Sequence, residues 1–390
     1  MIARVSFLYG VFFSLPLSFL NILPFGVKID DLILCFLLGL LSLQRISSGK
    51  KISFNKYAFL FVAISAFFAL VSLIISNLNI SFYLGDDSIT VFFRVVQSLL
   101  IILLISWMQS QRKFVDALFS GILLGSFVSL IVFLCYFFAH VNVSMFLSRG
   151  VYFTKDIFQY TDNIPFTVHV NTLGSFFLIS FFIIYFKSTS WHGKLASFLF
   201  VVPSFLLIAK GDLVAISFFF MVLYFSHSSS RRLILCVLTL LCIAFSPAIF
   251  SLYHSLNQYR VYTSERDEIY ISAFKSILEN PLGYGLGSQN NVIFNASGIN
   301  FPAHNIFLSL GLEFGWLYLL CFIVFICIWL FRSKVEAKNK LVFICYLLIG
   351  LFGNAMYFYK YHTIVLAISM FSLWGRASYE SMLHAEQKYC

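Results

Sequence analysis

Residues 57–76 read YAFLFVAISAFFALVSLIIS, a run without a single charged side chain. About 20 apolar residues in an α-helix span the ~30 Å hydrocarbon core of a bilayer. Similar runs recur along the chain, and their continuity excludes the alternating strands of an outer-membrane barrel. We place membrane spans near residues 5–23, 30–44, 57–76, 91–108, 114–139, 166–186, 195–209, 211–226, 233–250, 303–331, 341–358 and 362–375. The sequence therefore predicts an all-α polytopic membrane protein, with residues 1–390 forming a single transmembrane domain.

Composition agrees with this prediction. Hydrophobic residues make up 60% of the chain and charged residues only 11%, whereas charged residues make up about 25% of a typical soluble domain. With both termini in the cytoplasm, the inside segments hold 17 of the 26 basic residues but only four of the sixteen acids. The net charge of +10 is therefore the positive-inside signal of a membrane protein and gives no support to nucleic-acid binding.

Metal-binding patterns are weak. Seven of the eight cysteines fall within predicted spans and none forms a CxxC pair, which is typical of small apolar side chains in helices. The acidic pairs Asp30-Asp31 and Asp86-Asp87 fall in predicted outside loops. Paired carboxylates can bind a divalent cation, but such pairs are more often solvated loop charges or helix starts.

The largest polar excursion is a predicted outside loop at residues 251–302. Within it, residues 264–279 have an apolar face at helical spacing, formed by Ile269, Tyr270, Ala273, Phe274, Ile277 and Leu278. Ser264 and Asp267 suit a capping box. We therefore expect an amphipathic helix that lies on the bilayer surface. Arg266 falls in its first turn, where a guanidinium and free backbone amides can hold a diphosphate; an ion pair with a neighbouring acid is the alternative.

A glycine-rich turn, Leu282-Gly-Tyr-Gly-Leu-Gly-Ser288, follows that helix and precedes the tenth predicted span. We expect His304 in the first turn of that span, on the same face as Gly311 and Gly315. The two glycines form a GxxxG pair that favours close packing against another helix. On a continuous helix Glu313 would lie on the opposite side and ~13 Å deeper, which favours a structural role for its carboxylate.

Residues 194–232 are basic at both ends and are interrupted by Lys210-Gly-Asp212. Basic flanks at both ends require an even number of crossings. We therefore predict two short spans that meet at the outer face, with Lys210 on the same side as the large loop. Asn171, near the start of the sixth predicted span, is a weaker candidate for contact with a sugar.

Three stretches resemble motifs of the O-antigen ligase and polymerase superfamily, the Wzy and WaaL type of glycan-assembling membrane enzymes. The Arg266 helix and the Pro281-Leu-Gly-Tyr-Gly turn resemble that family's arginine-containing helix and Pro-Leu-x-Gly-x-Gly turn. Ala303-His-Asn-Ile-Phe-Leu resembles its His-Asn-x-x-Leu motif. Ile208-Ala-Lys-Gly-Asp-Leu resembles the site where the family usually shows Ser-Arg-Gly, with Lys210 in place of arginine. A lysine binds phosphate without the bidentate fork of arginine.

The resemblance implies a metal-independent, inverting glycosyltransferase of the bacterial inner membrane, without a cofactor and with its site facing the periplasm. Its donor would be an oligosaccharide linked to undecaprenyl diphosphate, and a flippase and a chain-length regulator would be its partners. His304 would accept the proton of the acceptor hydroxyl. Arg266 and Lys210 would neutralise the leaving diphosphate. Further substrate contacts would come from Asn305, Arg260, Tyr270 and Asn171, with Tyr270 in place of a tryptophan that the family commonly shows shortly after the loop arginine.

Four functions remain open from the sequence. We favour an O-antigen or related polysaccharide polymerase, which joins lipid-linked repeat units. The second is a ligase that transfers finished glycan to lipid A-core, since both reactions use the same donor linkage. A flippase or other transporter of lipid-linked oligosaccharides is the third. A metal-dependent glycosyltransferase that uses Asp30 and Asp31 is the fourth.

Overall fold

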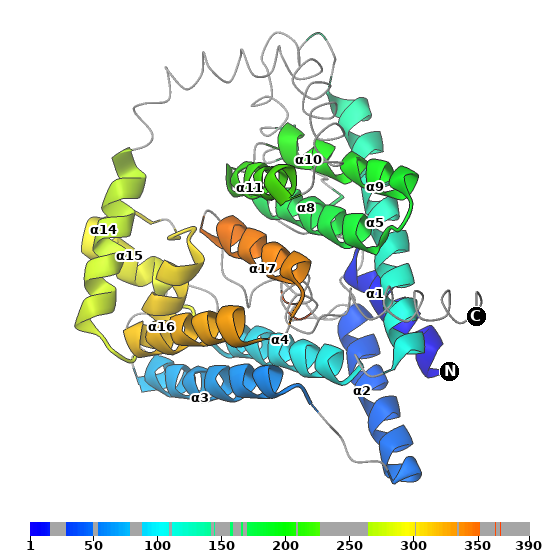
Figure 1. Cartoon of the computed structure of the whole chain (residues 1–390). Helices are drawn as coiled ribbons and strands as arrows, with labels where there is room; N and C mark the ends of the chain where they lie inside the picture. Colours follow the sequence, from blue (N-terminus) through cyan, green and yellow to red (C-terminus); the bar gives the residue numbers. More distant parts are fainter. Residues whose placement is uncertain are drawn as a thin grey trace.

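A computed structural model of the chain describes residues 1–15, 29–49, 54–78, 88–108, 111–141, 144, 157–158, 165–166, 170–207, 210–226, 264–300, 302–333, 335–351, 363 and 367. Within these ranges the fold is helical and contains no strand (Figure 1). The elements are α1 (Ile2–Phe13), α2 (Ile29–Ser48), α3 (Lys56–Leu78), α4 (Ser88–Met108), α5 (Arg112–His140), α8 (Val170–Lys187), α9 (Trp191–Ser197), the 3-10 helix η4 (Phe198–Phe200), α10 (Val201–Leu206), α11 (Lys210–Ser226), α14 (Ser264–Glu279), α15 (Gln289–Ser297), α16 (Ile306–Arg332) and α17 (Ala337–Gly350).

Four described helices are long and apolar enough to cross a membrane, namely Lys56–Leu78, Ser88–Met108, Lys113–His140 and Ile306–Arg332. The all-helical class with apolar helices of spanning length is therefore confirmed. Shorter apolar helices occupy three further predicted spans, at Ile2–Phe13, Thr172–Lys187 and Gly211–Phe225. The predicted spans at 233–250 and 362–375 lie outside the described residues, apart from single positions. The total of twelve spans stays a prediction.

Helices α1 and α5 pack closely because glycines line their contact. A Cβ atom on Gly10 would lie 2.4 Å from the carbonyl oxygen of Leu118, and one on Gly121 would lie 2.2 Å from the carbonyl oxygen of Phe7. Both distances are far below van der Waals contact, so the two backbones meet at a separation that any side chain would prevent. Small residues at such crossings are typical of helix packing in membranes.

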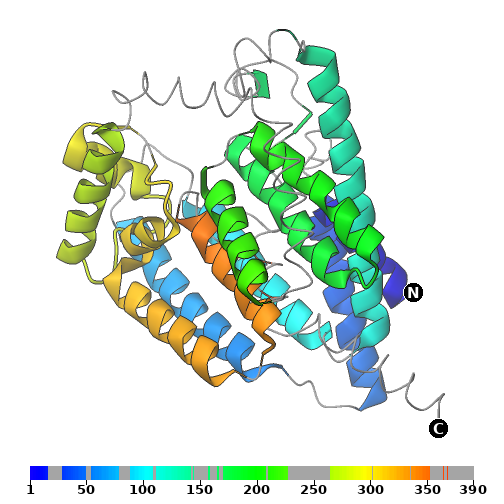
Figure 2. The same cartoon turned by 45° about the horizontal axis from the view of Figure 1, so that its top comes forward.

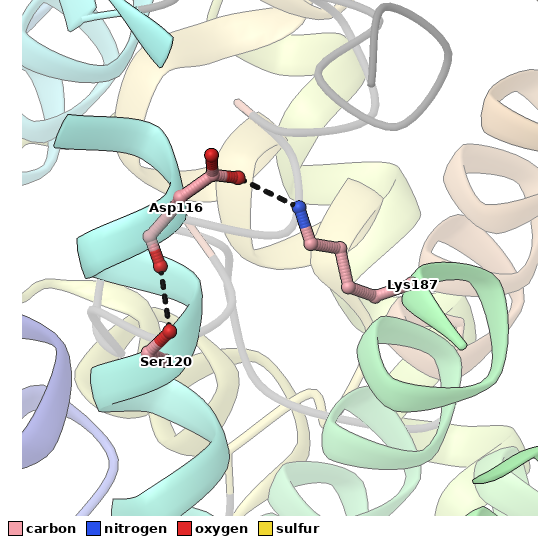
Figure 3. Close-up of polar contacts among 3 residues, drawn as sticks. All are labelled: Asp116, Ser120 and Lys187. Atoms are coloured by element: carbon pink, nitrogen blue, oxygen red, sulfur yellow. Dashed lines mark hydrogen bonds and ion pairs between the residues drawn. The ribbon is translucent and has the colours of Figure 1, made fainter. Parts of the chain in front are cut away.

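An ion pair joins α5 to α8. The Nζ atom of Lys187 lies 3.0 Å from Oδ1 of Asp116, and the hydroxyl of Ser120 donates to the carbonyl oxygen of Asp116 (Figure 3). Both charged side chains are partly exposed, so the pair contributes little to stability. It does place the end of α8 beside the start of α5. The charge distribution independently assigned Asp116 and Lys187 to the same side of the membrane.

A second, smaller core lies apart from the main one and is built from α14, α15 and the first part of α16. Its buried members are Ile269, Ala273, Ile277, Val292, Ile293, Ala303 and Leu312. We refer to this unit, residues 264–314, as the cap. The cap lies at one end of α3 and α16, and α14 runs crosswise to both helices (Figures 1 and 2).

Candidate functional site

Helix α16 is broken at Gly315, where the backbone has φ 87° and ψ 167° inside an otherwise helical run. The expectation of a continuous helix through a GxxxG pair is therefore wrong. Gly311 does make a close contact, because a Cβ atom there would lie 2.6 Å from Cδ1 of Ile277 on α14. Gly315 instead adopts a conformation that is essentially restricted to glycine. The break separates a cap part of α16, residues 306–314, from the long apolar part that follows.

The glycine-rich turn fills this break. The amide of Tyr284 donates to the carbonyl oxygen of Leu312 at 2.8 Å, and the amide of Leu317 donates to the carbonyl oxygen of Pro281 at 3.3 Å. These bonds replace helical hydrogen bonds that the break removes, as buried backbone groups require. Gly283, at φ 78°, lies so close that a Cβ atom on it would be 2.5 Å from the amide nitrogen of Gly315. The turn is therefore built into the helix and joins α14 to α16.

Serines on α3 complete the junction. The hydroxyl of Ser72 donates to the carbonyl oxygen of Glu313 at 2.7 Å, and that of Ser76 donates to the carbonyl oxygen of Leu286 at 3.1 Å. Ser65, on the same face of α3, shares a hydrogen bond with the hydroxyl of Tyr318. All three serines are buried. They tie α3 to both parts of α16 and to the glycine-rich turn.

His304 lies before α16 and not in its first turn. The helix begins at Ile306, and Oδ1 of Asn305 caps it by accepting from the amides of Phe307 and Leu308 at 2.9 and 3.2 Å. The prediction that His304 shares a helical face with Gly311 and Gly315 is therefore wrong, because His304 is not part of the helix. Among the described residues, His304 is the one non-glycine residue with a positive φ, at 47°. A histidine in this left-handed region costs about 1 kcal/mol or more relative to ordinary backbone.

The cap brings His304 and the arginine-bearing helix to one small core. Ala303, the residue before His304, is 1% exposed and shares this core with Ile269 of α14. Helix α14 occupies Ser264–Glu279, and Arg266 falls in its first turn, as the sequence predicts. Arg266 is thus three residues, or about 5 Å along the helix axis, from Ile269. The side chains of residues 264–267 lie outside the described residues.

The other candidate residues are placed less fully. The ring of Tyr270 packs against the core of the cap, and the side-chain oxygen of Asn305 is used in capping α16. Lys210 is the first residue of α11 and Asn171 the second residue of α8, but neither side chain is described. Arg260 lies outside the described residues.

The acidic residues singled out in the sequence are placed as follows. Asp30 and Asp31 lie in the first turn of α2. The pair therefore marks a helix start, one of the alternatives that the sequence left open. Asp86 and Asp87 lie outside the described residues. Glu313 is 2% exposed in the cap part of α16, as expected for a carboxylate that faces the protein interior.

Two polar features were missed at the level of sequence. Ser65, Ser72 and Ser76 follow one face of α3 by helical spacing, and that spacing was the available signal. Asp212, on α11, is 1% exposed and its Oδ1 accepts from the hydroxyl of Ser175 on α8 at 2.8 Å. A buried acid within an apolar helix is itself a signal that warrants attention.

These features define an all-helical protein with apolar helices of membrane-spanning length and a folded cap at the end of two of them. A scan against models of known protein families and a search of curated proteins both found no match to this chain. Its function is therefore proposed from the residues themselves.

Proposed function

We propose that the chain is a membrane glycosyltransferase of the O-antigen polymerase type, with twelve spans and both termini in the cytoplasm. It transfers a glycan from undecaprenyl diphosphate to an acceptor repeat unit at the periplasmic face of a bacterial inner membrane. The observation that carries the proposal is the left-handed backbone of His304, held beside the core that also fixes α14. Strain of this kind persists where the surrounding structure enforces it, and it is concentrated at functional sites.

In the proposed reaction the imidazole of His304 accepts the proton of the acceptor hydroxyl. The hydroxyl oxygen attacks the anomeric carbon of the donor sugar, and the bond from that carbon to the diphosphate oxygen breaks. A single displacement inverts the configuration at this carbon. The guanidinium of Arg266 neutralises the charge of the departing diphosphate, and the ammonium of Lys210 assists from the start of α11.

The test compares His304→Ala and His304→Gly in a strain that lacks the chromosomal gene. Both variants should abolish chain extension and leave single repeat units attached to lipid. The glycine variant should be about 1 kcal/mol more stable than the alanine variant, because glycine adopts the left-handed region without penalty. His192→Ala, an exposed histidine on α9, is the matched control and should keep wild-type chain lengths. Wild-type chain lengths in His304→Ala would refute the assigned base.

The same strain separates the polymerase from the ligase. Loss of a polymerase still leaves core lipid capped with one repeat unit, whereas loss of a ligase leaves core lipid uncapped. Uncapped core lipid would show that the acceptor is lipid A-core and not a repeat unit, with the donor and the site unchanged.

A further inference from the structure

Helix α14 carries two apolar faces, and only one of them is covered. Ile269, Ala273 and Ile277 are at most 3% exposed, because they pack against α15 and α16 in the core of the cap. Phe274 and Leu278, which the sequence grouped with them, instead point outward with Ile271. These three side chains are 56%, 60% and 56% exposed, respectively. We call Ile271, Phe274 and Leu278 the outer stripe.

The charged residues of α14 from Glu268 onward occupy a third, narrow face. Glu268, Lys275 and Glu279 are exposed. At 100° per residue they fall within about 40° of one another, along one edge of the outer stripe. A surface helix in water places polar residues on the whole side opposite its core. From Glu268 to Glu279 the exposed charges of α14 are confined to this edge, and large apolar side chains take the other exposed positions.

The outer stripe leads through the glycine-rich turn to the exposed apolar flank of α16. Leu282, just beyond α14, is 41% exposed and lies where the glycine-rich turn enters α16. A Cβ atom on Gly315 would lie 2.6 Å from its carbonyl carbon, and the next residue is the partly exposed Trp316. Leu320, one turn further along α16, is 53% exposed. Apolar surface therefore runs from α14 through the turn to the flank of α16.

The end of α3 packs on the same turn and adds exposed apolar side chains at this level. Gly285 of the turn is packed on Ser76, since a Cβ atom on the glycine would lie 2.8 Å from the serine amide nitrogen. At the same level, on the side of α3 that faces away from this contact, Ile74 and Leu78 are 59% and 77% exposed. The flanks of a helix that crosses a membrane contact lipid, and tryptophan is enriched at the level of the headgroups. Trp316, next to the contact between Gly315 and Leu282, is therefore the residue expected at the headgroup level beside the end of α14.

We propose that the outer stripe is embedded among the acyl chains of the leaflet on the cap side of the membrane. In that position Phe274 and Leu278 contact lipid, while the charged edge of Lys275 and Glu279 faces headgroups and water. An amphipathic helix with large apolar side chains on one face and charges beside it binds at this boundary. Since α14 runs crosswise to α3 and α16, it can lie along the surface (Figure 2). The inference requires only a membrane protein and is independent of the proposed glycosyl transfer.

The test is photo-crosslinking in the full chain, reconstituted into vesicles of phosphatidylethanolamine and phosphatidylglycerol. A benzophenone amino acid replaces Phe274 or Leu278 in the stripe, Glu268 on the charged edge, or Leu320 on the flank of α16. Adducts with lipid, detected as a mass increase of the tryptic peptide, are expected at 274 and 278 with a yield close to that at 320. The yield at 268 should be several-fold lower.

Three results would overturn the proposal. Adducts at 274 and 278 with another part of the chain would show that the chain itself covers the stripe. Adducts with a second copy would make the stripe a dimer contact. Yields at 274 and 278 no higher than at 268, with lipid adducts present at 320, would place the stripe in water. A second measurement uses the Phe274→Trp variant in vesicles with brominated acyl chains. The fraction of tryptophan fluorescence that the bromines quench should be larger in this variant than in the wild type.

Discussion

Replacement of Gly315 by alanine should be among the most destabilising single-methyl changes at the junction between the cap and the rest of α16. Its φ of 87° with ψ of 167° is a region that costs other residues about 1–3 kcal/mol. The added Cβ atom would also lie 2.2 Å from the carbonyl oxygen of Pro281 and 2.5 Å from the amide nitrogen of Gly283. Both are backbone atoms, so no side-chain rotation can relieve the overlap.

Relief of that overlap would require the glycine-rich turn to withdraw from the helix. Withdrawal breaks the hydrogen bonds from Tyr284 to Leu312 and from Leu317 to Pro281. Each bond contributes roughly 1 kcal/mol, and a buried group left without a partner costs ~1–3 kcal/mol. Together with the backbone strain, we expect Gly315→Ala to destabilise the protein by about 3–6 kcal/mol.

Two other glycines provide matched controls. Gly298 has φ 76° but nothing within 4 Å of an added Cβ atom, so Gly298→Ala should cost only the backbone strain of about 1–2 kcal/mol. Gly39 lies in α2 with open space around it, and Gly39→Ala should be neutral or stabilising by up to ~1 kcal/mol. In thermal unfolding in detergent, the midpoint temperature should be highest for Gly39→Ala, lower for Gly298→Ala and lowest for Gly315→Ala. Equal midpoints for the Gly315 and Gly298 variants would refute the packing of the turn into α16.

The remaining predictions concern other contacts of the cap. Ser72→Ala should lower the free energy of unfolding by about 1–3 kcal/mol, because it leaves a buried carbonyl without its donor. Ser47→Ala, at an exposed helix end, should change the free energy of unfolding by less than ~0.5 kcal/mol. Equal losses of the two variants in chemical denaturation would contradict the contact between α3 and the cap. Gly311→Ala should cost roughly 1–3 kcal/mol by overpacking, and Ile277→Val should recover part of that loss in a double-mutant cycle, so strict additivity would argue against their contact. Burial raises the pKa of Tyr284 above its ordinary value. The neutral hydroxyl therefore contributes stability below pH ~10, and this contribution is lost as the pH rises through the raised pKa. Between pH 9 and 11, Tyr284→Phe should lose less stability than the wild type, and parallel losses would refute this.

The sequence predicted the elements that local signals define. The range of α14 matches the prediction because a capping pattern at Ser264 and Asn280-Pro281 at the other end are local features of the chain. The start of α16 was misplaced for a related reason. Asn305 precedes an apolar run and is a good N-cap, and using that signal would have put His304 outside the helix.

The break in α16 depends on distant parts of the chain and so left no local pattern. A GxxxG pair inside an apolar run favours a continuous helix, and only the inserted turn makes a break at Gly315 favourable. The division of α14 into a covered and an exposed apolar face is equally non-local. Helical periodicity shows that Ile277 and Phe274 are apolar, but not which of them the rest of the cap covers.

The break also changes where the charge of Glu313 lies. On a continuous helix this carboxylate would sit about 13 Å below His304, within the hydrocarbon layer. In the proposed placement of α14, with the helix broken at Gly315 and Trp316 at the headgroup level, the spanning part would run from Trp316 to Arg332, about 25 Å at 1.5 Å per residue. That length nearly matches a bilayer core, and Arg332 supplies the charged anchor at its far end. Glu313 then belongs to the cap, where protein rather than lipid surrounds it. A perturbation of the turn should consequently shift the cap and His304 while leaving the span in place.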